Sequence, residues 1–412
     1  MKKLSKSSMF CCVIFFWLGS VSFSADWPQW RGPQRDGKVS GFSAPSQWPA
    51  ELKQKWSVPV GLGVATPALA GRRLYVFTRQ GDEEAILCLD ADSGKEIWSN
   101  RYAAVAVTGA PGRFPGPRSS PAVGEGKVVT LGVGGVLSCL QADDGKLLWR
   151  TDPYSGVVPR FFTAMSPLIT DTMAIAQLGG QGNGGILAFD LTTGQVKWQW
   201  TQEGPEYASP MILTAEGTRQ IIALTEKSVV GLALEDGRLL WKLPFLPLER
   251  SYNSVTPIVD GPVVVYSGAS RGTFAVRIEK QGEQFVPVLL WENKEIATRY
   301  NTPVLHQGYL YGLSEKGNLF CLNAADGKLS WLDEVQRDRG GFGAIVDVGS
   351  ALMALPSNGE LIVLEPDEKA FKQKVLWKTA QTPVYAHPVI DGGRIYIKDE
   401  QNLTLWTLEE PL

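Results

Sequence analysis

Arginines and aromatic residues recur side by side in short segments of the chain, and both residue types are well suited to bind a ligand. The arginines are Arg113, Arg118, Arg160, Arg250, Arg299 and Arg339. The aromatic residues are Phe114, Phe161, Tyr207, Tyr252, Tyr300, Phe342 and Tyr385. A guanidinium group is a planar fork that binds carboxylate or phosphate, and tyrosine is a rigid amphipathic contact residue. If the fold gathers these segments on one face, the pattern predicts a surface that binds a small anion or a peptide.

The same arginines have a structural alternative, in which they tie neighbouring segments of the fold together. Their partners in that interpretation are Glu206, Glu249, Asp338 and loop carbonyl groups. Both roles stay open at this point, because each requires only that a guanidinium group lie beside an acceptor.

Other chemistry finds little support in the residues. His306 and His387 stand singly, without the HExxH spacing of a zinc site, so no metal site is expected. The glycine-rich run 178–185 (LGGQGNGG) is not followed by a helical pattern, so it lacks the helix N-terminus of a phosphate-binding loop. We therefore predict no catalytic residue.

A repeat positions all of these segments. One phrase recurs: an apolar strand, an acidic or polar turn that ends in Gly-Lys or a similar pair, and then a tryptophan, as in LCLDADSGKEIW and FCLNAADGKLSW. The tryptophans that end its copies are 40 to 51 residues apart, which is the length of a four-stranded propeller blade. They are Trp56, Trp98, Trp149, Trp198, Trp241, Trp291, Trp331 and Trp377.

A Ser-Pro or Thr-Pro pair marks the start of most repeats. Proline at the first residue of a strand removes no ladder hydrogen bond, so Thr66-Pro67 and its counterparts indicate strand entries. The arginine and aromatic segments come directly before these pairs. Acidic residues such as Asp90 and Asp326 fall in the turns before the tryptophans, where their side chains cap turns.

The fold expected from this array is all-β: an eight-bladed propeller of four-stranded antiparallel blades. The strands that belong with Trp56 do not precede it but follow Trp377, so an N-terminal strand is expected to complete the last blade and close the ring. This assigns 51–412 to a single propeller domain. Residues 26–50 are rich in proline and glycine and are predicted to form a strap across the outside of the ring.

Residues 1–25 carry the pattern of a signal peptide, with three lysines before an apolar run and small residues after it. The chain is therefore predicted to be exported to the periplasm or to the extracellular space, with no transmembrane segment after cleavage. Three cysteines stay in the mature chain, Cys88, Cys139 and Cys321, and they occupy equivalent positions in different repeats. Such positions are far apart in a propeller, so these cysteines are expected to be buried and unpaired. With 40 basic and 42 acidic residues, a nucleic-acid partner is not expected.

The repeat resembles the PQQ-like propeller repeat of the quinoprotein alcohol dehydrogenase-like family. The match rests on the Asp-Gly-Lys-x-x-Trp phrase over residues 56–408, and the opening WPQWRGPQRDG is similar to the start of many secreted bacterial PQQ-repeat proteins. In that family the tryptophan at the end of a blade docks between blades. The family includes PQQ-dependent dehydrogenases and also a non-enzymatic propeller lipoprotein of outer-membrane assembly, so the fold does not settle the function.

The resemblance implies two functions that the residues help to separate. The dehydrogenases hold PQQ and Ca²⁺ in the channel and place a disulfide of adjacent cysteines against the quinone. The adjacent pair Cys11-Cys12 lies in the predicted signal peptide, and no counterpart of the calcium ligands is found. The sequence favours a non-catalytic scaffold that binds an envelope protein or peptide, without a cofactor. A reduced quinoprotein that oxidises an alcohol or sugar is the alternative, and a sugar-binding module is a third hypothesis.

Overall fold

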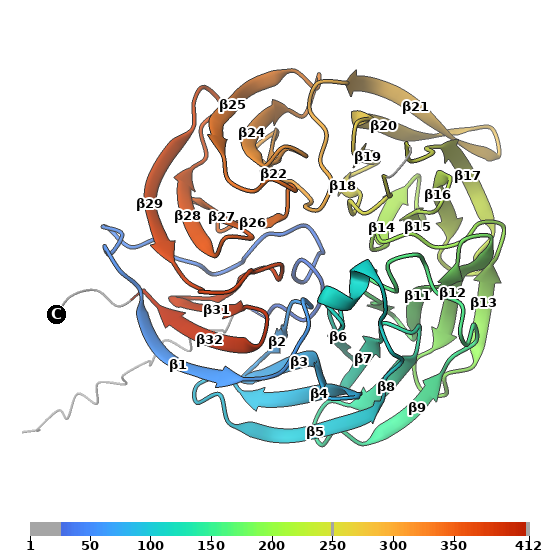
Figure 1. The fold of residues 1–412 in the computed structure, drawn as a ribbon. Helices are drawn as coiled ribbons and strands as arrows, with labels where there is room; N and C mark the ends of the chain where they lie inside the picture. Colours follow the sequence, from blue (N-terminus) through green and yellow to red (C-terminus); the bar gives the residue numbers. More distant parts are fainter. Residues whose placement is uncertain (1–25, 249–250, 409–412) are drawn as a thin grey trace, which may run out of the picture.

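The computed structural model describes residues 26–248 and 251–408. The predicted signal peptide (1–25), Glu249 and Arg250 lie outside the described residues. The described strands form eight four-stranded antiparallel sheets arranged as a ring, which confirms the predicted eight-bladed propeller (Figure 1).

Each blade runs from an inner strand to an outer strand in chain order. The first four blades are β2 (Ala68–Ala70), β3 (Arg73–Gln80), β4 (Glu83–Asp90) and β5 (Glu96–Ala103); β6 (Ala122–Gly124), β7 (Lys127–Leu131), β8 (Leu137–Gln141) and β9 (Leu147–Thr151); β10 (Leu168–Thr170), β11 (Met173–Gly180), β12 (Asn183–Asp190) and β13 (Val196–Trp200); and β14 (Met211–Ala215), β15 (Thr218–Leu224), β16 (Ser228–Ala233) and β17 (Leu239–Pro244).

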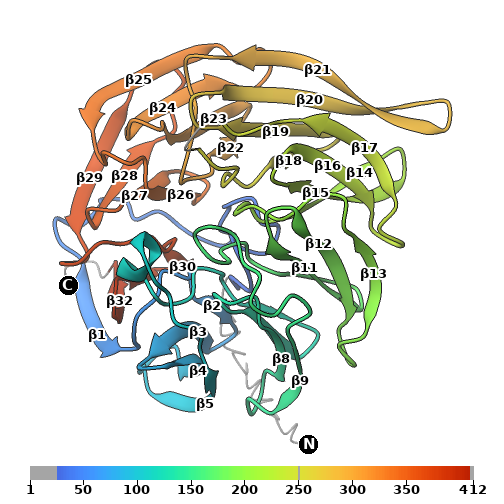
Figure 2. The same cartoon turned by 45° about the vertical axis from the view of Figure 1, so that its right-hand side comes forward.

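The next three blades follow the same order. They are β18 (Ile258–Asp260), β19 (Val263–Gly268), β20 (Gly272–Gln281) and β21 (Gln284–Asn293); β22 (Val304–His306), β23 (Tyr309–Leu313), β24 (Asn318–Asn323) and β25 (Leu329–Gln336); and β26 (Gly343–Asp347), β27 (Leu352–Pro356), β28 (Glu360–Glu365) and β29 (Lys372–Lys378). The hairpin of β20 and β21 is longer than the others and projects from the ring (Figure 2).

The eighth blade joins the two ends of the described chain. Its strands are β30 (Val389–Asp391), β31 (Arg394–Lys398), β32 (Asn402–Thr407) and, as the outer strand, β1 (Lys53–Pro59). Trp56 of β1 lies opposite Leu405 of β32 in an antiparallel pair. The predicted closure of the ring by an N-terminal strand is therefore confirmed.

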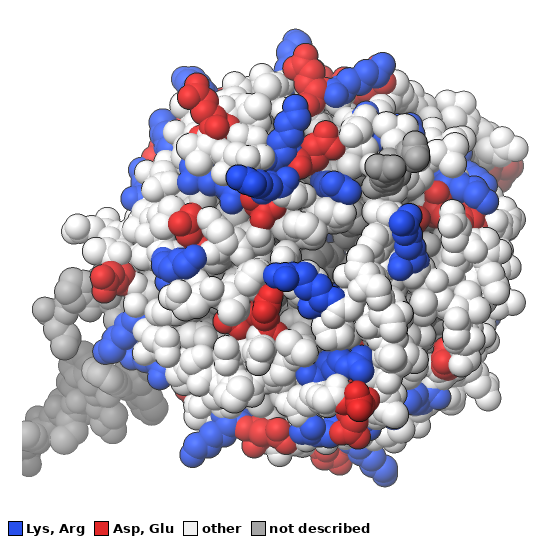
Figure 3. Space-filling model, viewed as in Figure 1, with Lys and Arg blue, Asp and Glu red and all other residues white. Residues whose placement is uncertain are grey.

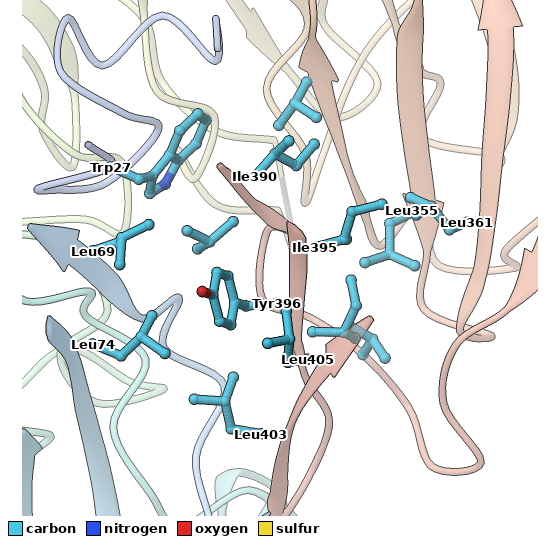
Figure 4. Packing of buried hydrophobic residues seen from close by; sticks show 14 of the residues in the cluster. Trp27, Leu69, Leu74, Leu355, Leu361, Ile390, Ile395, Tyr396, Leu403 and Leu405 are labelled. Atoms are coloured by element: carbon cyan, nitrogen blue, oxygen red, sulfur yellow. The ribbon is translucent and has the colours of Figure 1, made fainter. Parts of the chain in front are cut away.

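The middle strands of a blade are buried on both faces because the neighbouring blades cover them. All six residues of β16 (SVVGLA) are buried, whereas the outer strand β5 is half exposed. Apolar clusters accordingly bridge adjacent blades, and one of them joins the blades on both sides of the closure (Figure 4). Cys88, Cys139 and Cys321 are buried and unpaired in such positions, as predicted. The described residues contain one helical segment, the 3-10 turn η1 (Ala110–Arg113), and no helix long and apolar enough to cross a membrane.

The repeat tryptophans lie at the blade interfaces. Trp98 Nε1 donates to Ala142 O in the following blade at 3.1 Å, and Trp149, Trp198, Trp291 and Trp331 make the equivalent bond. Trp377 donates to Pro49 O, just before β1. Two depart from the pattern: Trp241 donates to Gln220 in its own blade, and Trp56 Nε1 is buried without a partner in the described chain.

The strap lies elsewhere than predicted over most of its length. Residues 42–50 do lie on the outside of the ring, where Trp48 packs on Trp377. Residues 27–39 instead cross the middle of the ring: Trp27 pairs with Leu69 in the first blade, and Lys38 pairs with Asp347 in the seventh (Figure 1). The prediction of an external strap is therefore wrong for this part, because its tryptophan and arginines find buried partners in the channel.

Candidate functional site

The connections between blades bring seven aromatic residues to one cavity. The cavity has a volume of about 400 Å³ and opens on the face that carries η1. Each aromatic residue comes from a different connection, just before the inner strand of its blade. We call this set the aromatic belt: Phe114, Phe161, Tyr207, Tyr252, Tyr300, Phe342 and Tyr385.

The aromatic belt consists of two arcs of rings in mutual contact. In one arc Phe161, Tyr207 and Tyr252 meet edge to face, with centroids 5.0 to 6.4 Å apart. The other arc begins with Tyr300 stacked on Phe342 at 4.1 Å and continues through Tyr385 to Phe114. Contacts of this kind stabilise ring pairs beyond their burial, so the wall of the cavity is preorganised.

The described arginines of the predicted set differ in their contacts and in their exposure. Arg113, Arg160 and Arg299 each lie over the ring of the next residue in the chain, at 5.3, 5.6 and 4.8 Å from the ring centroid. Arg113, Arg160 and Arg339 are exposed, and we call these three the arginine rim. Basic side chains lie around the hollow at the centre of this face, with acidic side chains among them (Figure 3).

Among the described arginines of the predicted set, Arg118 alone lines the cavity. It donates to Phe114 O at 2.9 Å and to Pro111 O at 3.4 Å, while its other terminal nitrogen is buried without a described partner. Burial lowers the pKa of Arg118, and Tyr207 and Glu84 raise it by smaller amounts. No described carboxylate lies within ion-pair distance of this guanidinium group.

The carboxylates proposed as structural partners are engaged differently. Asp338 accepts the N–H groups of Gly340 and Phe342 and the Ser357 hydroxyl. Glu206 is largely buried and has one unpaired oxygen, and burial with the nearby charge of Glu226 raises its pKa to about 8. Among the described residues, neither forms an ion pair with a predicted arginine, whereas loop carbonyls do accept from Arg118.

A ring of hydroxyl groups lies next to the aromatic belt, and four of its six members line the cavity. In each of six blades the Ser or Thr before the inner strand accepts a backbone N–H from the equivalent residue of the preceding blade, at 2.9 to 3.3 Å. This hydroxyl ring consists of Thr66, Ser120, Ser166, Ser209, Thr256 and Thr302. It stops where the seventh blade has Gly343, which carries no hydroxyl. The Ser-Pro and Thr-Pro pattern predicted the strand entries but not this function of the hydroxyl groups.

The strap closes the cavity at the level of the hydroxyl ring. Trp30 lines the cavity, donates from Nε1 to Thr256 Oγ1 at 3.1 Å and packs at 4.6 Å on the His387 ring. His387 is buried, its Nδ1 has no described partner, and burial together with Arg31 lowers its pKa well below the usual range. Trp30 belongs to no repeat, and the one sequence signal for it is the presence of three tryptophans, Trp27, Trp30 and Trp48, within residues 26–50.

Two buried arginines anchor the strap beneath Trp30. Arg31 donates to Thr302 O and Pro303 O, and Arg35 donates to Ser166 O and Pro167 O on another part of the ring. Both side chains are almost fully buried, and burial lowers their pKa values to about 10 and about 9. The strap therefore places two cations beneath the cavity, although neither side chain lines it.

The cavity does not match the site that PQQ and Ca²⁺ would need. None of the described residues that line it is acidic, and nowhere in 26–248 and 251–408 do three His, Cys, Asp or Glu side chains form a potential metal site. Ca²⁺ takes six to eight oxygen ligands, usually with carboxylates among them. His306 ends β22 and bonds Asp347 at 2.9 Å, away from the cavity. The donor set thus does not fit the metal-bound cofactor.

Comparison with known proteins places the chain among propellers of two kinds. The family model described as outer membrane protein assembly factor BamB matches residues 35–113 and 108–333. The Yersinia pestis protein of that name is 25% identical over 293 residues, which cover 66% of this chain and 69% of the relative. The crystal structure of BamB from Moraxella catarrhalis has a TM-score of 0.65 at 14% identity and covers 86% of this chain and 99% of that one. The quinohemoprotein alcohol dehydrogenase from Comamonas testosteroni has a TM-score of 0.72 at 14% identity, covering 94% and 81%. At these identities the two structures show the fold alone.

Proposed function

The chain belongs to the family described as outer membrane protein assembly factor BamB, and from this premise we propose that it is a non-catalytic scaffold of the cell envelope that binds a protein partner. We infer a role in the assembly of outer-membrane proteins because its relatives are described as outer membrane protein assembly factors. The exported location that such a role requires agrees with the signal-peptide pattern of residues 1–25.

The observation that carries the proposal is the arginine rim. Arg113, Arg160 and Arg339 are exposed around the mouth of the cavity, and none of them forms an ion pair with a described carboxylate. Their guanidinium groups are free to receive carboxylates from another protein, and arginine is enriched in protein interfaces for this reason. The strap crosses the centre of the ring towards the opposite face, between Leu69 and Asp347, which favours the rim face as the binding surface.

The test uses the mature chain (26–412) with the triple variant Arg113→Gln, Arg160→Gln and Arg339→Gln. The control removes three exposed basic side chains from the turns of the opposite face, in Arg72→Gln, Lys146→Gln and Arg238→Gln, so the net charge changes equally. Immobilised wild-type and control proteins are expected to retain a component of the outer-membrane assembly machinery, identified by mass spectrometry, and the rim variant to lose it. Equal retention by rim and control variants would exclude the rim as the interface. Failure of the wild type to retain any such component would contradict the proposed function.

A further inference from the structure

We propose that the cavity inside the aromatic belt is a binding site for a small amphipathic anion, which has an apolar or aromatic body and a single carboxylate, sulfonate or phosphate group. Arg118 receives the charge. The site lies inside the mouth, so it is distinct from the arginine rim and does not depend on the partner-binding function.

The shape and lining of the cavity specify the body of the ligand. About 400 Å³ is within the range of small-molecule sites, which are concave, mainly apolar and equipped with few polar groups. The aromatic belt surrounds this space, and Trp30 closes it at the bottom. The ring contacts within the belt hold the wall before a ligand arrives, which lowers the entropic cost of binding.

The fixed charges around the cavity specify the sign of the ligand. Arg118 lies in the wall, and Arg31 and Arg35 lie beneath the floor. All three guanidinium groups donate to uncharged acceptors, and no described lining residue is acidic. Three cations in a partly enclosed space of low dielectric create a positive potential that favours an anion and disfavours a cation.

The unpaired polar atoms specify where the anionic group sits. Nη1 of Arg118 is a buried donor without a described partner, and the lining hydroxyl groups of Ser166 and Ser209 accept backbone N–H groups and still have an O–H to donate. A buried donor without an acceptor is costly, and a charge-assisted hydrogen bond to an oxyanion relieves that cost. Nη2 of Arg118 is held by Phe114 O and Pro111 O, and because Nη1 is buried, the guanidinium group must turn to present Nη1 to a ligand.

The experiment compares two fluorescent probes that share their aromatic rings and differ in charge. 8-Anilinonaphthalene-1-sulfonate carries a sulfonate, and N-phenyl-1-naphthylamine is neutral. We expect the mature wild-type chain to bind the sulfonate at one site per molecule and more tightly than the neutral probe. Arg118→Gln should weaken the sulfonate by roughly tenfold or more and leave the neutral probe unchanged, since one charge-assisted bond is lost. The affinity of Arg118→Lys for the sulfonate probe should lie between those of the wild type and Arg118→Gln, because lysine keeps the positive charge but not the planar guanidinium group.

The controls distinguish binding at this site from nonspecific binding of the probes and from the proposed function. Arg72→Gln, on the opposite face, should bind both probes as the wild type does, and the melting temperature of each variant establishes that it is folded. Equal affinities of the wild type for the two probes, several sulfonate sites per chain, or an unchanged affinity in Arg118→Gln would overturn the proposal. The rim triple variant should still bind the sulfonate probe, and Arg118→Gln should still retain the protein partner. Failure of one proposal is therefore distinguishable from failure of the other.

Discussion

The backbone N–H of His387 donates a hydrogen bond of 2.9 Å to Thr66 Oγ1, although the two residues are 321 positions apart in the chain. This bond joins the last blade to the first, and Thr66 N–H continues the series to Ser120 Oγ at 3.1 Å. The last blade is therefore joined to the first at two places, by β1 at the outer edge and by this bond near the centre. The inner closure lies in the wall of the cavity, so it couples the stability of the ring to the shape of the site.

Removing one hydroxyl from this ring should destabilise the fold. In Thr66→Val the buried N–H of His387 loses its acceptor, whereas Thr66→Ser keeps an oxygen there. We expect the free energy of unfolding to fall by about 1–3 kcal/mol in the valine variant relative to the serine variant. Urea denaturation measures the difference. Equal stability of the two variants would show that the ring contributes shape but no free energy.

The buried arginines of the strap should be essential for its attachment. Arg31→Met leaves the carbonyls of Thr302 and Pro303 without their charged donor, and we expect a loss of about 2 kcal/mol or more. Exposed Arg72→Met serves as the control and should stay within about 0.5 kcal/mol of the wild type. Denaturant unfolding gives the stabilities, and limited proteolysis within 26–50 reports release of the strap. A strap equally resistant to protease in both variants would contradict this anchoring role.

The packing of Trp98 against the next blade predicts a large effect at Gly145. A Cβ on Gly145 would lie 2.4 Å from the Trp98 ring, whereas a Cβ on Gly126 would meet nothing within 4 Å. Both glycines have positive φ, 72° and 68°, so alanine causes similar backbone strain at each. The excess destabilisation of Gly145→Ala over Gly126→Ala should be about 1–3 kcal/mol, the usual range for overpacking. Thermal unfolding of the pair tests this, and equal melting temperatures would mean that the tryptophan adjusts freely.

Glu206 should make the protein less stable as the pH rises above neutrality. Its folded-state pKa of about 8 exceeds the ordinary value of 4.5, so the folded protein binds its proton more tightly than the unfolded chain. Stability from this group is present at low pH and is lost between these values. Neutral His387 has the opposite effect below its ordinary pKa of 6.5. Between pH 6.5 and 8 the effect of Glu206 is therefore separated from that of His387. In this range Glu206→Gln should flatten the decline of the unfolding free energy with pH. The same slope in variant and wild type would assign the decline to another group.

Addition of PQQ and Ca²⁺ to the mature protein should give no dye reduction with alcohols or sugars. The cavity lining contains no described carboxylate to hold the cation, and the described cysteines are unpaired. Absorbance titration and a redox-dye assay test this expectation. Stoichiometric PQQ binding with turnover would replace the scaffold proposal by the quinoprotein alternative, whatever the outcome for the sulfonate probe.

The repeat, and with it the ring, follows from the sequence alone. The spacing of Trp98, Trp149 and their counterparts indicated the blade length, and the displaced Trp56 indicated closure by β1, because a propeller repeats one local pattern of strands and turns. The same regularity placed the arginine and aromatic segments before the inner strands. It followed that Phe114, Tyr300 and the other members of the aromatic belt would lie on one face.

The contacts of these residues, in contrast, depend on the closed fold. Arg113 and Arg118 belong to the same segment, yet one lies over an aromatic ring at the surface and the other lines the cavity with a nitrogen unpaired. Residues 27–39 have no repeat to indicate their path, and their position depends on bonds such as that from Arg31 to Thr302, across 271 residues. Local spacing fixes periodic strands, but the orientation of a side chain in an irregular segment is set by whichever distant acceptors the closed ring brings within reach.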